Sequence, residues 1–398
     1  MLFVKSDKLK VGMRLARPIY NRNGVLLYER NSKLTSQGIV SVNNFGLIGV
    51  YVLEPAEPVP PMSEDDIEFE RFQTMCVFAI KEVLNSIIET KKAPKMYTIA
   101  TNIIKSYGKL DRKINFIQNL RSKEDYVYKH SLNVAILGAM ISNTMHLKAD
   151  EQFDIVTAAI VHDIGKLVYD KSINQKGISE EEERERSRKA EIAGFDIISD
   201  VISPNPSLKR ICVQSQKILS DFEKEILDLH VKPSIGTKIM MVAETFDMMT
   251  AMNYKQEPSS EVAAIRFLLD NEQVFDPRVV EALIQSIYLL SPGTCIELNS
   301  NAKGLVLTSN ETDFLKPMVL MFADNKVIDL ANEKSCGNLE IKDIMKTLDN
   351  RYIMDTELLQ KHGYKVEHAE VMGIVTDAEV KEKNDDEDID EYIPGQDF

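Results

Sequence analysis

Hydrophobic residues recur at helical spacing through the middle of the chain. Phe72, Cys76, Ile80, Leu84 and Ile87 follow one another at steps of three or four positions, which places them on one face of a helix. Similar spacing continues from about residue 64 to residue 290, and patterns typical of strands are scarce there. The sequence therefore predicts a mainly α fold, with a helical bundle over 64–290.

Segments with the shorter period of β-strands flank this helical region. Residues 1–55 contain a strong hairpin signal at Asn23-Gly24, and beyond Ser291-Pro292-Gly293 apolar runs alternate with Asn- and Ser-rich turns. We predict a small N-terminal β-rich module and a small C-terminal β extension. The expected strands cover 15–20, 25–28, 50–53, 295–298, 304–307 and 318–321.

Proline and acidic residues mark the predicted boundaries. The stretch 56–63 is rich in proline, which favours an extended linker. Residues 379–398 contain nine Asp or Glu and two Lys, a composition typical of disordered tails. The predicted organisation is a β-rich module at 1–55, a linker at 56–63, a helical domain at 64–290, a β extension at 291–345, a C-terminal segment at 346–378 and an acidic tail at 379–398.

Composition limits the classes of partner. The net charge of -14 repels phosphate backbones, so we expect no nucleic-acid partner. No run of 18 apolar residues occurs and the N-terminus lacks the pattern of a signal peptide, which predicts no membrane span and a cytoplasmic location. The four cysteines are scattered, without the spacing of a zinc site or a disulfide framework.

Three places along the helical region carry residues suited to metal chemistry. His130 lies on the apolar face of its predicted helix, where a lone histidine is usually a hydrogen-bonded core residue. His162 and Asp163 end an apolar helix, and an imidazole and a carboxylate there can bind one divalent metal if both turn inward. Glu244 and Asp247 share one face of a later apolar helix, so their burial implies a metal or a hydrogen-bond network.

The order of a histidine, a His-Asp pair and a late carboxylate resembles the HD phosphohydrolase superfamily. The blocks 123–135, 162–166 and 242–250 resemble the signatures of HD-GYP domains, which are cyclic di-GMP phosphodiesterases. Residues 12–20 are similar to a module often found before such domains, and 291–319 are similar to their C-terminal β extension. The resemblance covers about residues 5–345.

This resemblance implies roles for five residues. His130, His162, Asp163 and Glu244 are expected to hold one divalent metal, such as Fe or Mn, and Asp163 is expected to extend to a second metal. Lys166 is expected to face the substrate phosphate, so that Asp163 and Lys166 form the catalytic pair. Glu244 stands where the family has Asp, and its side chain, one methylene longer, is expected to weaken metal binding.

The positions expected to hold the second metal lack ligands. Ala190 stands where the family has a histidine four residues before a glycine, here Gly194, and the Gly-Tyr-Pro substrate loop is missing from 219–233. His230, the nearby imidazole in that stretch, is a weak candidate replacement. The family's paired histidines are expected within 212–218, where the chain instead has Gln214, Ser215, Gln216 and Lys217. One metal position is therefore expected to persist and the second to be absent.

Two functions are consistent with these substitutions. The first is a degenerate HD-GYP signalling protein with impaired or no hydrolysis, which acts by binding cyclic di-GMP, another nucleotide or a signalling protein. The second is an active metal-dependent phosphohydrolase, either a cyclic di-GMP phosphodiesterase or a single-metal nucleotide phosphohydrolase. Metal content and product release distinguish the two.

Overall fold

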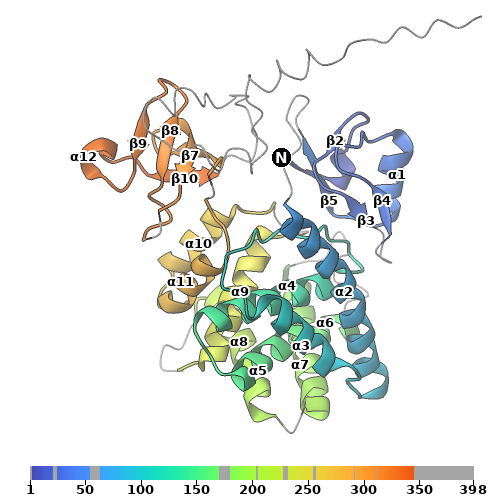
Figure 1. Ribbon diagram of the computed structural model, residues 1–398. Helices are drawn as coiled ribbons and strands as arrows, with labels where there is room; N and C mark the ends of the chain where they lie inside the picture. Colours follow the sequence, from blue (N-terminus) through green and yellow to red (C-terminus); the bar gives the residue numbers. More distant parts are fainter. Residues whose placement is uncertain are drawn as a thin grey trace, which may run out of the picture.

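The structure is a computed structural model of the 398-residue chain (Figure 1). It describes residues 2–20, 25–53, 63–169, 180–202, 205–226, 232–253, 257–290, 292–310 and 312–344. The hairpin signal Asn23-Gly24, most of the predicted linker 56–63, the segment 346–378 and the acidic tail 379–398 lie outside these residues.

A helical domain forms the centre of the molecule, with small β-sheets in the N- and C-terminal regions, which confirms the predicted fold class. None of its described helices is both long and apolar enough to cross a membrane. The helices are α2 (Glu64–Thr90), α3 (Met96–Tyr107), α4 (Tyr126–Thr144), α5 (Ala149–Val161), α6 (Ile164–Tyr169), α7 (Glu180–Ile202), α8 (Pro206–Glu223), α9 (Ile235–Thr250), α10 (Glu261–Asp270) and α11 (Pro277–Ser286).

Side-chain caps fix where several of these helices begin. Ser63 and Asp66 form a capping box at the start of α2, in which each side chain binds the other residue's backbone N–H. Asn205 and Ser234 cap α8 and α9 by accepting from backbone N–H groups of the first turn. Helix α4 is buried along nearly its whole length and packs against α5, α9 and α11 at the centre of the core.

The N-terminal module combines two small sheets with one helix. Strands β1 (Leu2–Lys5), β5 (Gly49–Leu53) and β2 (Arg14–Leu15) form one sheet, and β3 (Ile19–Tyr20) pairs antiparallel with β4 (Leu26–Tyr28). The predicted strand 15–20 is therefore two strands, separated by a segment that contains Pro18. Helix α1 (Ser36–Asn44) was not predicted, although Thr35 caps it.

The C-terminal module is a five-stranded antiparallel sheet with its own apolar core. Its strand order is β10-β6-β7-β8-β9. The three predicted strands correspond to β6 (Cys295–Leu298), β7 (Lys303–Thr308) and β8 (Met318–Met321). The short elements β9 (Val327–Asp329), α12 (Glu333–Cys336) and β10 (Ile341–Ile344) were not predicted.

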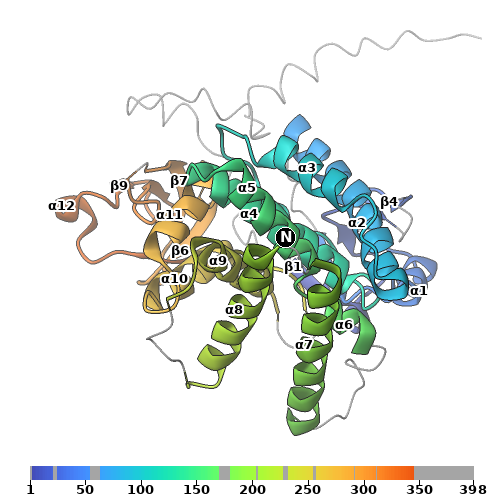
Figure 2. The same ribbon diagram turned by 90° about the horizontal axis from the view of Figure 1, so that it is seen from below.

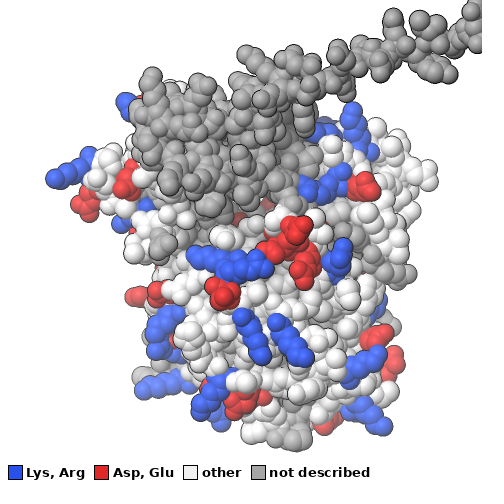
Figure 3. Space-filling view, in the orientation of Figure 1, with Lys and Arg blue, Asp and Glu red and all other residues white. Residues whose placement is uncertain are grey.

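Both β modules lie at the same end of the helical domain, one on each side (Figure 1). Seen from below, α7 and α8 project from the rest of the bundle (Figure 2). Acidic and basic side chains are interspersed over the described surface in Figure 3. The C-terminal module contacts α10, where Arg266 donates to backbone carbonyls of β10.

Candidate metal centre

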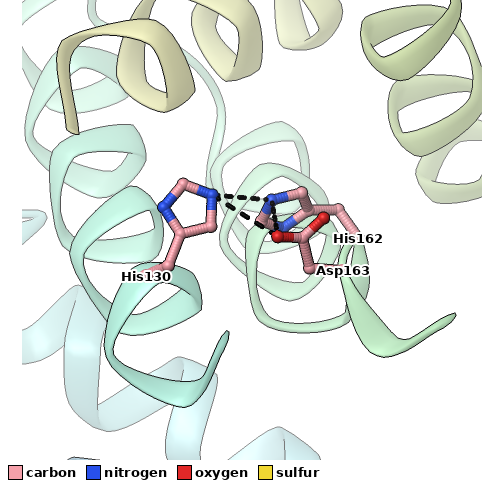
Figure 4. Close-up of side chains that lie close together, drawn as sticks. All are labelled: His130, His162 and Asp163. Atoms are coloured by element: carbon pink, nitrogen blue, oxygen red, sulfur yellow. Dashed lines mark hydrogen bonds and ion pairs between the residues drawn. The ribbon is translucent and has the colours of Figure 1, made fainter. Parts of the chain in front are cut away.

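His130, His162 and Asp163 come together inside the helical domain (Figure 4). His130 lies in the second turn of α4, whereas His162 and Asp163 occupy the junction between the end of α5 and the start of α6. One ligand atom from each side chain lies within 4.8 Å of the other two, and all three residues are buried. The end of an apolar helix thus turns an adjacent imidazole and carboxylate inward, which is the condition that the sequence set for both to bind one metal.

The distances place two ring nitrogens and one carboxylate oxygen around a common point. Nε2 of His162 lies 3.3 Å from Nε2 of His130. Oδ2 of Asp163 lies 3.6 Å from Nε2 of His130 and 3.7 Å from Nε2 of His162. These atoms are too far apart for strong direct pairing, yet close enough to share one small cation.

Hydrogen bonds on the opposite edges of the two imidazoles fix which ring nitrogen carries the hydrogen. Nδ1 of His162 lies 2.8 Å from the carbonyl oxygen of Ala159, which can only accept, so Nδ1 carries the proton. Nδ1 of His130 lies 2.6 Å from Oδ2 of Asp247 and likewise donates to an ionised carboxylate. When both rings are neutral, both Nε2 atoms present lone pairs toward Asp163.

Three electron-pair donors therefore converge in a buried space. Such a group is unfavourable unless a proton, a metal ion or a neighbouring cationic side chain compensates the donors. Two imidazole nitrogens and a carboxylate oxygen are common ligands of Zn, Fe and Mn, and each imidazole is oriented by a partner on its other nitrogen. The residues present fit one divalent metal.

Asp247 belongs to a buried network that the sequence indicated only in part. Its carboxylate accepts from the Arg121 guanidinium, with Nη2 lying 2.6 Å from each oxygen, and from Nδ2 of Asn133 at 2.8 Å. Burial alone would raise the pKa of Asp247, but Arg121 and His130 hold that pKa well below its usual range. The carboxylate is thus ionised and orients His130.

Sequence reasoning missed Arg121. Its side chain is fully buried, and its guanidinium lies 5.1 Å from the ring centre of Tyr126. Arg121 precedes α4 in a segment without regular structure, so neither periodicity nor a metal-binding motif marks it. The available signal was Asp247, a buried carboxylate that needed a cationic partner.

Glu244 lies one helical turn before Asp247 on α9 but outside the 4.8 Å group. The residue is 7% exposed, and its Oε2 is buried without a hydrogen-bond partner. An unpaired buried carboxylate oxygen is costly, and such atoms are often metal ligands or catalytic groups. The expected role of Glu244 as a fourth ligand stays a prediction.

Lys166 lies beside the group. Its Nζ donates to Oδ2 of Asp163 at 2.7 Å, and its side chain is 35% exposed. Burial opposes the charge of both residues, yet the pKa of Asp163 is lowered by Lys166 and the two histidines, and the pKa of Lys166 is raised chiefly by Asp163. Lys166 therefore keeps its positive charge at the edge of the site.

Ala190 lies next to the His-Asp motif. An added Cβ on Gly165 would come within 1.9 Å of the carbonyl oxygen of Ala190 and 2.6 Å of the backbone nitrogen of Gly194. Helices α6 and α7 therefore pack backbone to backbone here, and Ala190 itself is buried. Its methyl group offers no ligand atom where the family resemblance implies a histidine.

Residues 214–217 are the other four positions where ligands of the second metal were expected, and the structure describes the surroundings of each. Gln214 accepts from the Thr237 hydroxyl at 3.0 Å, and Gln216 donates to the backbone carbonyl of His162 at 2.6 Å. Ser215 donates to a carbonyl of its own helix, and Lys217 is exposed. The weak replacement candidate His230 and much of the stretch searched for a Gly-Tyr-Pro loop lie outside the described residues.

Comparisons with known proteins agree with this geometry. The family model described as HD domain matches residues 127–272, a span that contains His130, His162, Asp163, Glu244 and Asp247. Cyclic di-GMP phosphodiesterase PA4108 of Pseudomonas aeruginosa is 21% identical over 277 residues, which cover 68% of this chain and 67% of that protein. Cyclic di-GMP phosphodiesterase PdeB of Borreliella burgdorferi is 29% identical over 234 residues, 56% of this chain and 59% of that protein.

Two solved structures were also matched. Bd1817, an HDG"Y"P protein from Bdellovibrio bacteriovorus, aligns with a TM-score of 0.43 and 13% identity, over 71% of this chain and 97% of that one. The HD domain of the L. monocytogenes phosphodiesterase PgpH aligns with a TM-score of 0.28 and 16% identity, over 40% of this chain and 89% of that one.

Proposed function

We propose that the chain, whose residues 127–272 match the HD domain family model, is a cyclic di-GMP signalling protein of the HD-GYP type with one divalent metal and impaired or no hydrolysis. His130, His162 and Asp163 hold that metal, and Glu244 completes the ligand set. The observation that carries the proposal is the convergence of three buried donors, two of them imidazoles whose other nitrogens are already hydrogen-bonded.

The second metal position is absent in this proposal. Ala190 and the residues at 214–217 offer no imidazole or carboxylate, and the two glutamine amides in that stretch have protein partners. A two-metal site clamps both the attacking and the leaving oxygen of a phosphodiester. A single metal position lacks half of that clamp, which supports slow or absent hydrolysis.

The remaining chemistry is suited to binding a nucleotide phosphate. When bound, the metal supplies Lewis acidity toward a phosphoryl oxygen. Lys166 stays protonated and partly exposed beside Asp163, so its ammonium group attracts a phosphate at the edge of the site. We further propose that the chain acts in the cytoplasm and passes its nucleotide state to a signalling protein.

An active phosphohydrolase is the second candidate. The ionised Asp163 beside Lys166 and two imidazoles favours it, because one-metal HD proteins need only a single cluster of this kind. Its substrate would be cyclic di-GMP or another nucleotide phosphate ester.

Metal content and product release test the proposal. The purified full-length chain is loaded with Mn²⁺ or Fe²⁺ and freed of excess ion, and its metal is counted by mass spectrometry. Cyclic di-GMP is then added, with binding measured by calorimetry and product by chromatography. We expect about one metal per chain and nucleotide binding with little linear pGpG or GMP.

Matched variants make the result specific. His162→Ala should abolish metal retention, whereas His146→Ala should leave it unchanged, because His146 lies outside the buried group. Two metals per chain with rapid pGpG release would overturn the degenerate proposal in favour of the enzyme. Failure of the wild-type chain to retain either ion would refute the proposed metal centre.

A further inference from the structure

The N-terminal module contacts the helical domain through the backbone next to Arg121. The N–H of Ile48 donates to the carbonyl oxygen of Arg121 at 3.1 Å, and the N–H of Lys123 donates to the carbonyl of Gly46 at 3.3 Å. Leu47 and Ser122 form an antiparallel β-bridge between these two bonds. A short two-stranded contact thus joins residues 46–48 to residues 121–123.

The side chain of Arg121 extends from this contact to the metal centre. Its guanidinium binds both oxygens of Asp247 at 2.6 Å, and Asp247 in turn accepts from Nδ1 of His130 at 2.6 Å. Each of these three side chains is at most 1% exposed. Two consecutive hydrogen-bonded contacts therefore connect Arg121 to Nδ1 of His130, the imidazole whose Nε2 faces the metal position.

A second contact holds the same segment from the other side. Nη1 of Arg17, in the N-terminal module, donates to the carbonyl oxygen of Gln118 at 2.5 Å. Gln118 is buried, and its Oε1 accepts from Asn133, which also donates to Asp247. Segment 118–123 is thus held by the module through its backbone, and it directs Arg121 to Asp247 and Gln118 to Asn133, which itself donates to Asp247.

The module does not pack tightly against the whole helical domain. A cavity of about 90 Å³ lies between them, lined by Arg17 and Leu47 of the module, by α2, by α4 and by residues 117–120. Because this space separates the two parts next to segment 118–123, the direct contacts at Arg17 and at 46–48 are important for fixing that segment.

We infer that Arg121 is a positioning residue through which the N-terminal module orients the metal ligand His130. The inference rests on the proposed metal centre and adds a route by which movement of the module changes metal affinity. Buried pairs of this kind have two discrete arrangements, bonded or broken, rather than a continuous range. A module that shifts would loosen segment 118–123, free Asp247 and release the ring of His130.

The first test replaces the side chain that links the two parts. Arg121→Met should lower the Mn²⁺ affinity of the full-length chain by about 10- to 100-fold, the usual effect of removing a group that orients a metal-bound histidine. Arg121→Lys keeps one charged donor and should recover part of the loss. The hydrogen-bonded Nδ1 proton of His130, observed by proton NMR without metal, should be lost in Arg121→Met.

The second test leaves Arg121, Asp247 and His130 unchanged and alters the module instead. Arg17→Met removes the bond to Gln118, and Ile48→Pro removes the N–H that donates to Arg121. Each should weaken Mn²⁺ binding about fivefold or more and broaden the Nδ1 signal of His130. The control is Arg14→Met, because Nη1 of Arg14 donates to Asn31 within the module.

The outcomes separate this inference from the proposed function. In one outcome, the wild type binds no metal and still shows an Nδ1 proton signal for His130 that is lost in Arg17→Met and Ile48→Pro. In that case the proposed metal centre fails and the coupling stands. If wild type and both module variants bind Mn²⁺ equally well with an unchanged Nδ1 signal, the coupling is refuted. Equal losses in Arg14→Met would also refute it, because a general loosening of the module would then be responsible.

Discussion

At the scale of single residues, the hydrogen-bond partners of the polar atoms determine which atoms are available to bind a metal. His130 and His162 each use one nitrogen for a fixed hydrogen bond and direct the other toward Asp163. Glu244 differs, because its Oε2 is buried and unpaired. The same atom is expected to destabilise the metal-free protein and to strengthen metal binding.

Replacing Glu244 by methionine separates these two effects. Glu244→Met removes the unpaired oxygens with little change in volume, so we expect the metal-free chain to gain about 1–3 kcal/mol in its free energy of unfolding. The affinity for Mn²⁺ should fall, because a ligand is lost. Chemical denaturation measures the first change and titration calorimetry the second.

The prediction requires both changes in Glu244→Met: a higher free energy of unfolding without metal and a lower affinity for Mn²⁺. A variant that loses stability without metal would show that the Glu244 carboxylate is satisfied in the folded chain. Unchanged Mn²⁺ affinity would remove Glu244 from the ligand set.

At the scale of elements, α9 carries Glu244 and Asp247, two of the three acidic residues of the site, and is anchored at its other end. Lys238 in the first turn of α9 donates from Nζ to Oδ2 of Asp276 at 2.8 Å. Asp276 is the N-cap of α11, where it accepts from the backbone of Arg278 and pairs with its guanidinium. The hydrogen bond from Arg278, followed by that from Lys238, lowers the pKa of Asp276, although burial opposes the shift.

This link predicts a specific pH dependence. A carboxyl group whose folded-state pKa is lowered stabilises the protein above its unfolded pKa of about 4 and loses that contribution as the pH falls. Asp276→Asn keeps a good N-cap but removes the charge, so at pH 7 we expect the free energy of unfolding to fall by about 0.5–1 kcal/mol. The loss is small because solvent screens the exposed Arg278 guanidinium.

Denaturant unfolding of both proteins between pH 7 and pH 2 measures this difference. The gap between wild type and Asp276→Asn should narrow as the pH falls below about 4. A gap that is constant or that widens on acidification would contradict the assignment of the lowered pKa to Asp276.

At the scale of the whole molecule, α4, α5 and α9 meet at the proposed metal centre, so we expect ion binding there to be coupled to folding of the helical domain. An ion that binds the folded chain alone stabilises it by about 2.7 kcal/mol at 100 times its dissociation constant. We expect saturating Mn²⁺ to raise the unfolding temperature of the wild type and to leave His162→Ala nearly unchanged. Equal shifts in both proteins would indicate binding elsewhere.

Much of the fold follows from the sequence. The 3.6-residue period marks α2, because a helix that packs on a core must repeat its apolar residues along one face. Strands β6, β7 and β8 were predicted from short apolar runs between turn residues. Helix α1 was missed, because its nine residues span too few turns for a helical period to stand out, and its apolar residues Ile39, Val40 and Val42 are β-branched, a type more common in strands.

The sequence by itself determined the mainly helical class and the candidate ligands His130, His162 and Asp163, because burial and ligand chemistry depend on local residue type and spacing. Tertiary structure alone decided that Asp247 orients His130, that Arg121 holds Asp247, and that residues 46–48 contact residues 121–123. These partners are far apart along the chain, and Asp247 follows Arg121 by 126 positions. Their pairing follows from packing and from the cost of burying an unpaired charge, which no local pattern encodes.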